Sequence, residues 1–231
     1  MERNNWERFA AVGGVGFVVV VLAGTFIALG TPKTDDPTST IVSYFNDHQT
    51  ALLISGMLSV LSTPPLLLYL SGLRSALLRL EGGQPQWTTV NFAGGLVLIP
   101  VAGSFAALNA LLTQHLAAGS DAELTRAVYQ LASISRGVAA IAVATFLFAG
   151  SVIMVRRAGV TRWIASGGFV FAALSLVSGC GAMLMDSSGI RFLGLVGLLG
   201  FLAWVLSTSL AMSMEARGAT TARPSATVTP A

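Results

Sequence analysis

The sequence is poor in charged residues, and this shortage excludes a water-soluble globule. Of its 231 residues, 10% are charged and 54% are hydrophobic. A soluble domain carries about a quarter charged residues, because its surface faces water. A chain of this length is expected to form one domain, and one domain cannot bury so much apolar surface in its own core. We therefore expect the lipid bilayer to cover part of it.

Cysteine and histidine are also scarce, and each shortage removes a class of site. Cys180 is the single cysteine, so an intramolecular disulfide and a thiolate metal cluster are excluded. The basic residues are scattered and the net charge is only +3, which argues against nucleic acid as a partner. Both histidines fall outside the apolar runs, which disfavours axial haem ligation inside a bundle. The P-loop, α/β-hydrolase and zinc-protease motifs are absent, so we assign no catalytic residue and no cofactor.

Six long apolar runs dominate what the sequence does contain, each near the ~20 residues that a membrane-spanning helix needs. The first, Phe9–Gly30, would be about 33 Å long as a helix, and we interpret it as a retained span rather than a signal peptide. The other five runs are Ala51–Leu73, Thr89–Leu112, Gly137–Val155, Trp163–Met185 and Phe192–Met214. The prediction is an all-α integral membrane bundle of six transmembrane helices over residues 9–214. A cytoplasmic segment, 1–8, precedes it, and a cytoplasmic tail rich in Ala, Thr and Pro, 215–231, is predicted to be disordered.

Arginine and lysine predict the orientation, because cytoplasmic loops carry an excess of both. Nine of these residues fall on one side of the predicted spans and four on the other. The larger set is Arg3, Arg8, Arg74, Arg79, Arg156, Arg157, Arg162, Arg217 and Arg223, and the smaller is Lys33, Arg126, Arg136 and Arg191. Trp6, Trp87 and Trp163 enter the odd-numbered spans from the richer side, where indole rings favour the headgroup layer. We predict a plasma-membrane protein with both termini in the cytoplasm.

Two amphipathic segments are predicted on the outer side. Asp36 is typical of a helix N-cap and is followed by Pro37 at the first helical position. Apolar and aromatic residues then recur at helical spacing over 41–48, which predicts a short amphipathic surface helix after the first span. Residues 121–135 carry a similar stripe and should extend the fourth span as a helix.

A metal site is the first candidate for chemistry. His48 and His115 should both lie at the outer membrane edge, near acidic residues. Imidazole and carboxylate groups together bind divalent metals. No metal-ligand spacing such as HxxxH is present. The simpler interpretation is therefore that both histidines lie in solvent-exposed loops and bind no metal. The metal hypothesis requires His48 and His115 to approach each other.

Arg136 defines the second candidate, a polar cavity. It begins the fourth span and shares a helix face with Tyr129. A charge at membrane depth is costly and often marks a substrate or ion path. Arg136 could pair with Asp47 or Asp186, although an arginine that extends from the boundary to the headgroups is the simpler interpretation.

The positions of proline and asparagine predict that the same cavity lies near spans two and three. Pro64 and Pro65 fall mid-span, as does Pro100, and each removes a backbone donor. Broken helices form substrate sites in transporters, whereas a plain kink is the simpler interpretation because proline is common in membrane helices. Asn109, like Asn91, could hydrogen-bond across the bundle. Arg136 and Tyr129 with Asn109, Pro64 and Pro65 make up the candidate cavity.

Glycine is arranged in pairs near the start of each odd-numbered span. The pairs are Gly13-Gly14, Gly94-Gly95 and Gly167-Gly168, and Gly194, Gly197 and Gly200 follow in span six. Repeated hairpins would produce such pairs, but close helix packing requires small residues wherever it occurs, and we favour packing.

Three short segments carry a resemblance to a known group. They are Ile41–His48, Leu70–Arg74 with the Glu81-Gly82-Gly83 turn, and Ala127–Leu131. With the spans placed as above, the chain resembles actinobacterial multi-pass membrane proteins of the DUF4386 type. The resemblance implies the six-span architecture and carries over no functional residue.

Three function classes follow from these patterns. The favoured class is a non-enzymatic accessory or regulatory protein acting on a membrane-protein partner or a second copy of itself, because no acidic residue lies within a span. The alternative is a small-molecule transporter or permease with its site near the interrupted spans two and three. The third is a metal- or redox-linked membrane enzyme.

Overall fold

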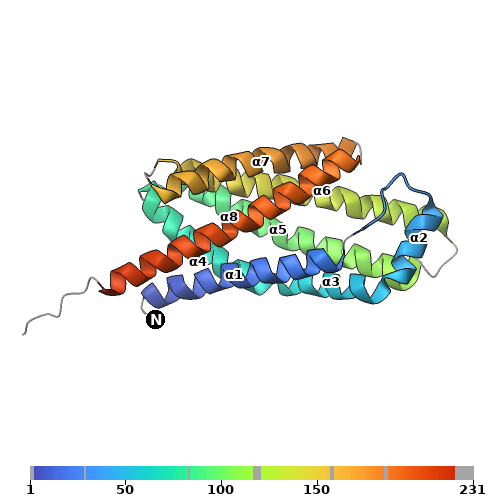
Figure 1. Cartoon of the computed structure of the whole chain (residues 1–231), viewed down its shortest axis with the longest axis horizontal. Coiled ribbons are helices and arrows are strands. Elements are labelled where there is room, and N and C mark those ends of the chain that lie inside the picture. The colour runs from blue at the N-terminus through green and yellow to red at the C-terminus, as the bar shows by residue number, and fades with distance from the viewer. Residues whose placement is uncertain are drawn as a thin grey trace, which may run out of the picture.

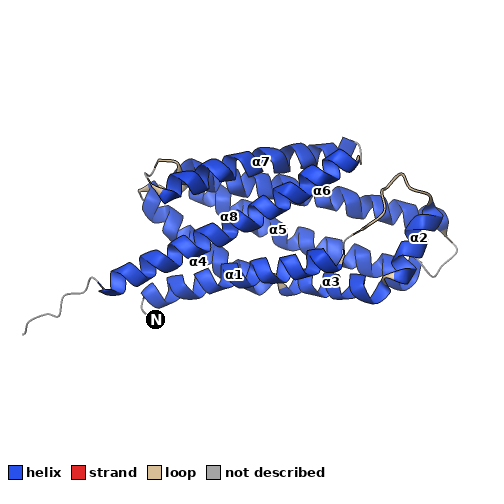
Figure 2. Ribbon diagram, viewed as in Figure 1, coloured by secondary structure: helices blue, strands red, loops and turns tan. Residues whose placement is uncertain are grey.

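The computed structural model describes residues 3–28, 30–82, 84–116, 121–156, 159–184 and 187–221, and within these ranges the regular structure is entirely helical (Figure 2). The elements in chain order are α1 (Arg3–Ile27), α2 (Thr38–Asp47), α3 (Gln49–Leu61), α4 (Thr63–Glu81), α5 (Gln86–Leu111), a short π-helix η1 (Leu112–Leu116), α6 (Ala122–Met154), α7 (Val160–Leu184) and α8 (Ser188–Thr221).

Six helical segments of the described chain are long and apolar enough to cross a membrane. They are α1, α3 with α4, α5 with η1, α6, α7 and α8. They lie side by side in one bundle, and α1 begins at the end of the bundle where α8 ends (Figure 1). The predicted all-α bundle of six spans is therefore confirmed.

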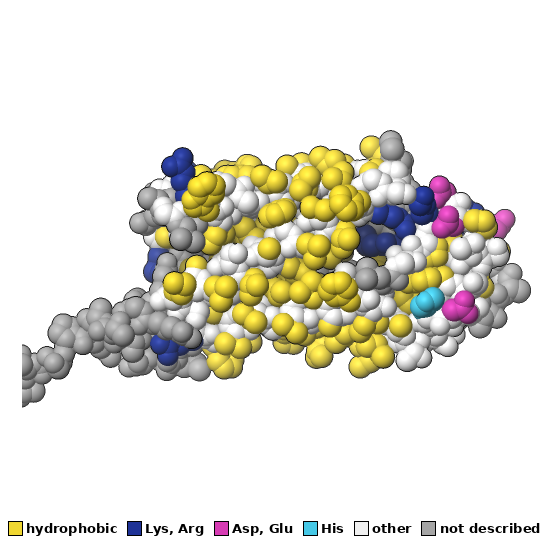
Figure 3. Space-filling view, in the orientation of Figure 1, with side chains coloured by type: hydrophobic (Ala, Val, Ile, Leu, Met, Phe, Trp, Pro, Cys, Tyr) yellow, Lys and Arg dark blue, Asp and Glu magenta, His cyan; other side chains and the backbone are white. Residues whose placement is uncertain are grey.

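The surface of the bundle is apolar around its middle. In the space-filling view, hydrophobic side chains cover the central part and charged side chains gather toward the two ends (Figure 3). Large apolar side chains here are well exposed, with Met57 74% and Val12 70% accessible. Because water would not tolerate so extended an apolar surface, this band is the part of the protein that contacts lipid.

The helices are longer than the apolar runs that predicted them. With 33 residues, α6 is roughly 50 Å long and overhangs a hydrocarbon core of ~30 Å. It begins at Ala122, where the Asp121 carboxylate accepts a hydrogen bond from the Leu124 N–H at 3.0 Å. The predicted extension over 121–135 is thus continuous with the fourth span.

The C-terminal boundary differs from the prediction. We expected disorder from residue 215, but α8 continues to Thr221. Glu215, Ala216, Arg217 and Ala219 between these points favour helix, and the first proline after the span is Pro224. Residues 222–231 of the predicted tail, and residues 1–2 of the N-terminal segment, lie outside the described chain.

The helix expected after the first span is present as α2. Ile41 and Phe45 are buried on its inner face and pack with Tyr129 of α6. The predicted cap is wrong, because Pro37 occupies the N-cap position and the Asp36 carboxylate accepts the Lys33 N–H at 2.7 Å instead. A place for α2 on the membrane surface stays a prediction.

Glycine brings neighbouring helices close together, as the packing interpretation predicted. A Cβ atom added to Gly179 of α7 would lie 2.8 Å from the carbonyl oxygen of Gly137 in α6. Gly194, Gly197 and Gly200 of α8 likewise face residues of α7 so closely that a Cβ would meet them at 2.8 Å or less. Small residues therefore set the α6–α7 and α7–α8 separations.

Two asparagines behave differently from each other. Asn91 is buried and donates from Nδ2 to the Phe146 carbonyl at 2.7 Å, which links α5 to α6 as predicted. Asn109 donates to the Phe105 carbonyl of its own helix, also at 2.7 Å, so the cross-bundle bond expected for it is not formed. The difference follows from what each side chain faces: Asn91 faces the backbone of α6, whereas Asn109 lines the cavity described below.

Candidate functional site

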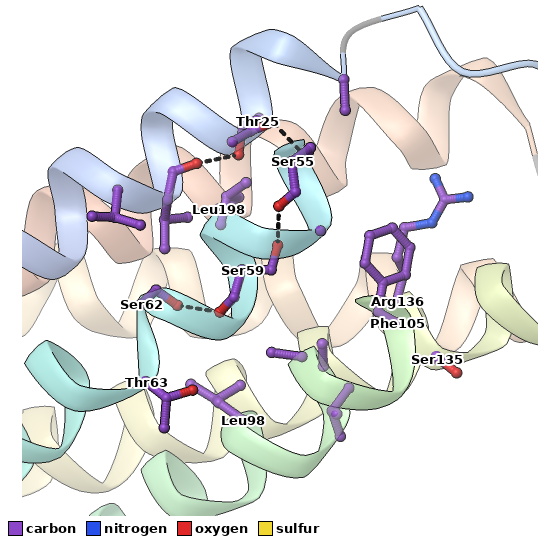
Figure 4. Close-up of a pocket in the computed structure, with 18 of the residues that line it drawn as sticks. Thr25, Ser55, Ser59, Ser62, Thr63, Leu98, Phe105, Ser135, Arg136 and Leu198 are labelled. Carbon is purple, nitrogen blue, oxygen red and sulfur yellow. Dashed lines mark hydrogen bonds between the residues drawn. The ribbon is translucent and has the colours of Figure 1, made fainter. Parts of the chain in front are cut away.

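A cavity of about 360 Å³ lies inside the bundle, between α1, α3, α4, α5, α6 and α8 (Figure 4). Its volume falls within the ~300–1,000 Å³ typical of small-molecule sites. Most of its wall is apolar, and polar side chains are set into that wall at a few places. This combination is the one that ligand sites usually show.

The polar part of the α3 wall is a row of three serines. Ser55, Ser59 and Ser62 follow at spacings of four and three residues, which places them on one face of the helix (Figure 4). The Ser62 and Ser59 hydroxyls donate to the carbonyls of Ser59 and Ser55 at 2.7 and 2.9 Å. The Ser55 hydroxyl donates across to the Gly24 carbonyl of α1 at 2.9 Å. Ser55 therefore ties α3 to α1, while all three serines line the cavity.

The serine row ends where the second span is interrupted. α3 stops at Leu61 and α4 starts at Thr63, with Pro64 and Pro65 in its first turn. Proline cannot donate a backbone hydrogen bond, so the helix cannot continue its regular pattern through this point. Ser62 and Thr63, at the interruption, both line the cavity.

Arg136 of α6 lies at another side of the cavity. Its guanidinium carbon is 5.6 Å from the centre of the Phe105 ring, and Figure 4 shows the two side chains together. The Nε atom is buried and has no hydrogen-bond partner. Within the described chain Arg136 forms no ion pair, since the ion pair found there joins Arg79 to Glu7 at 2.7 Å.

Of the two acidic partners proposed for Arg136, the structure describes only Asp47. Asp47 is exposed and its carboxylate accepts the Ser43 hydroxyl at 3.5 Å, so it does not pair with Arg136. Asp186 lies outside the described residues. The simpler interpretation also needs revision: Arg136 is half-buried and stacks on a ring in the bundle, rather than extending freely to the headgroups.

The structure separates the five residues grouped in the candidate cavity. Arg136 and Asn109 line it, whereas Pro64 and Pro65 do not, although the two residues before them do. Tyr129 is directed elsewhere: it is buried and its hydroxyl donates to the Pro32 carbonyl. A shared helix face with Arg136 did not bring Tyr129 to the same site, because Tyr129 packs against Ile41 and Phe45 of α2 and bonds the loop before it.

Arginines fix the loop between α1 and α2 near the cavity. Arg191 of α8 donates to the Thr31 and Pro32 carbonyls at 2.9 and 2.7 Å. Arg126 of α6 donates to the Thr34 carbonyl at 3.2 Å. Thr31 itself lines the cavity, so these contacts hold part of its wall in place.

The metal hypothesis is not advanced by the described residues. His48 lies between α2 and α3, with Nδ1 3.0 Å from the Tyr44 carbonyl and its ring stacked on Tyr44 at 4.6 Å. His115 belongs to η1, but its side chain lies outside what the structure describes. Among the described side chains, no three of His, Cys, Asp and Glu come together in a way that could hold a metal ion.

No family model, curated protein or solved structure matches the chain. The function of the cavity must therefore be inferred from its own residues.

Sequence reasoning missed the serine row and Thr25, which also lines the cavity. The sequence does contain a signal for the row. The spacing Ser55-x-x-x-Ser59-x-x-Ser62 places three hydroxyls on one helix face just before two prolines. Thr25 had no such pattern, because its hydroxyl donates to the Val21 carbonyl at 2.8 Å within its own helix, as isolated threonines in membrane helices commonly do.

Proposed function

We propose that this multi-pass membrane protein binds a small molecule in the cavity and carries it across the membrane. Of the three function classes, this is the transporter or permease. The observation that carries the proposal is a cavity of ligand size inside the bundle, with Arg136 and a row of hydroxyls on its wall.

The interruption of the second span supports this proposal. Transporters commonly build their sites from discontinuous helices near the middle of the membrane, where irregular backbone is tolerated when it is buried in protein or lines a water-filled cavity. Here α3 and α4 separate at Ser62, and that residue lines the cavity. An accessory protein that acts only through its outer surface has no need of such a cavity and would gain stability by filling it.

Location and orientation belong to the same proposal. We assign the protein to the plasma membrane. Both termini are assigned to the cytoplasm, as the arginine distribution predicts. The bundle end that carries Arg126, Arg191 and the loop between α1 and α2 then faces outward. Membership of the DUF4386-type group also stands as a proposal, and it adds no activity.

Access from water tests the proposal without knowing the substrate. In a Cys180→Ser background, single cysteines are introduced as Ser59→Cys and Ala102→Cys in the cavity wall, and as Met57→Cys, which faces outward with 74% of its surface accessible. A charged, membrane-impermeant thiol reagent should modify the two cavity cysteines in proteoliposomes. It should leave Met57→Cys unmodified, because hydrocarbon excludes the charged reagent.

The result that would defeat the transport proposal is equal protection of all three cysteines. That outcome would mean a cavity sealed from water, and it would return the protein to the accessory class.

A further inference from the structure

The charge on the cavity wall identifies the kind of ligand, on the assumption that the cavity is the binding site proposed above. Arg136 is the one charged side chain among the described residues that line it, and no acidic side chain lines it. Arginine stays protonated at any working pH. A half-buried cation without an ion-pair partner is unfavourable, and an anion placed beside it offsets part of that cost.

The guanidinium is arranged to receive an anion. Its stacking on the Phe105 ring restrains its orientation, and its Nε–H has no acceptor in the described structure. A guanidinium presents its N–H groups as a planar fork that matches the two oxygens of a carboxylate. An anion bound by this fork would satisfy the buried Nε–H, which no protein atom does.

Four hydroxyl groups along the α1 and α3 wall of the cavity act as acceptors rather than donors. The hydroxyl hydrogens of Thr25, Ser55, Ser59 and Ser62 are all donated to backbone carbonyls, at 2.7–2.9 Å. These groups therefore offer the cavity oxygen lone pairs and no hydrogen. Arg136 supplies the one full positive charge among the described lining residues, so one negative charge on the ligand is compensated there.

The remainder of the wall suits a hydrocarbon chain. Side chains of Phe17, Leu66, Leu98, Val143 and Phe201 supply it. A volume of about 360 Å³ lies at the small end of the ~300–1,000 Å³ range of small-molecule sites. That is enough for one medium-length chain and its head group, and too little for a lipid with two long chains.

The geometry points to an amphipathic monoanion as the ligand, with a carboxylate on Arg136 and a single apolar chain of about ten carbons along the rest of the cavity. Recognition divides between the two parts of the molecule. The chain provides affinity that any apolar molecule of this size would share, and Arg136 provides preference for the anion.

Binding of three ten-carbon probes to the full-length protein in nanodiscs tests this. The probes are decanoate, decanol and decyltrimethylammonium, which share a chain and differ in head-group charge. Partition into lipid is subtracted with nanodiscs of the Ser59→Phe protein, whose added ring fills the cavity. Decanoate should bind the natural protein at least tenfold more tightly than decanol, which is about 1.4 kcal/mol, and decyltrimethylammonium should bind more weakly than either.

Arg136→Gln should bring the affinity for decanoate down to that for decanol. Arg162→Gln, the same change at an exposed site outside the cavity, should leave the tenfold preference intact. The comparison of probes on the natural protein stands even if Arg136→Gln fails to fold.

The outcomes separate the two ideas. Equal binding of decanoate and decanol to the natural protein, or a preference that survives Arg136→Gln in a folded protein, would overturn the inference about charge and leave the cavity as a binding site. If no probe bound above the Ser59→Phe background, the proposed function and the inference would both fail.

Discussion

Replacement of Gly179 by alanine tests whether the close approach of α6 and α7 is set by their glycines. A Cβ at this position would lie 2.8 Å from the Gly137 carbonyl oxygen, 2.9 Å from Cγ1 of Ile141 and 3.2 Å from the Ile141 nitrogen. Comfortable contacts between such atoms are about 3.5–4.0 Å. Two of the three obstructing atoms belong to the backbone, so the helices must separate to make room.

The size of the effect follows from two opposing contributions. Overpacking of this kind typically costs about 1–3 kcal/mol. Replacing a helical glycine by alanine returns about 1 kcal/mol through helix propensity. The net loss for Gly179→Ala is then about 0–2 kcal/mol. Gly103 of α5 provides the control, because a Cβ there would meet nothing within 4 Å.

The free energy of unfolding of both variants is measured by titrating the protein from mild detergent into SDS and following helix content by circular dichroism. Since propensity contributes equally to both, Gly179→Ala should be less stable than Gly103→Ala by about 1–3 kcal/mol. Equal stability of the two variants would refute the claim that the α6–α7 contact depends on the absence of a side chain.

Three further experiments test two other contacts and the orientation of the protein. Asn91→Ala removes the bond to the α6 backbone and should lower the free energy of unfolding by about 0.6–1.7 kcal/mol in the same assay; no loss would mean that the bond does not form in the membrane. Glu81→Gln replaces the carboxylate that accepts the Trp87 and Thr88 N–H groups at the start of α5, at 2.7 and 3.0 Å. The free energy of unfolding should fall by about 1 kcal/mol, and an unchanged value would argue that this carboxylate does not cap α5. In a cysteine-free background, Lys33→Cys should react only from outside intact cells and Arg162→Cys only from inside, and labelling of both from one side would exclude the proposed topology.

Much of the fold could be predicted because hydrocarbon imposes one simple requirement. A chain segment that crosses it must be apolar for about 20 residues and must pair its own backbone groups, so hydropathy locates the spans. Hydropathy does not locate the helix ends. α6 starts 15 residues before Gly137, and α8 continues past Met214, because a helix persists into water wherever capping and propensity allow.

The candidate site was less predictable, because it depends on which faces of distant helices meet. The cost of an intramembrane charge marked Arg136, and its place on the cavity wall agrees with that argument. Tyr129 shares its helix face by spacing, yet the loop after α1 draws its hydroxyl away. Spacing along one helix carries no information about the neighbour that each turn will contact.

The Arg191 contacts have a consequence for biogenesis. The exit of the first span is fastened at Thr31 and Pro32 by a residue from the start of the last span, and α1 also packs along α8. Neither contact can form until synthesis has reached the sixth helix. During translation the Arg191 contacts with this loop are thus among the last to form. A chain truncated after five spans would hold the loop only from α6, through Tyr129 and Arg126, and would leave one wall of α1 facing lipid instead of protein.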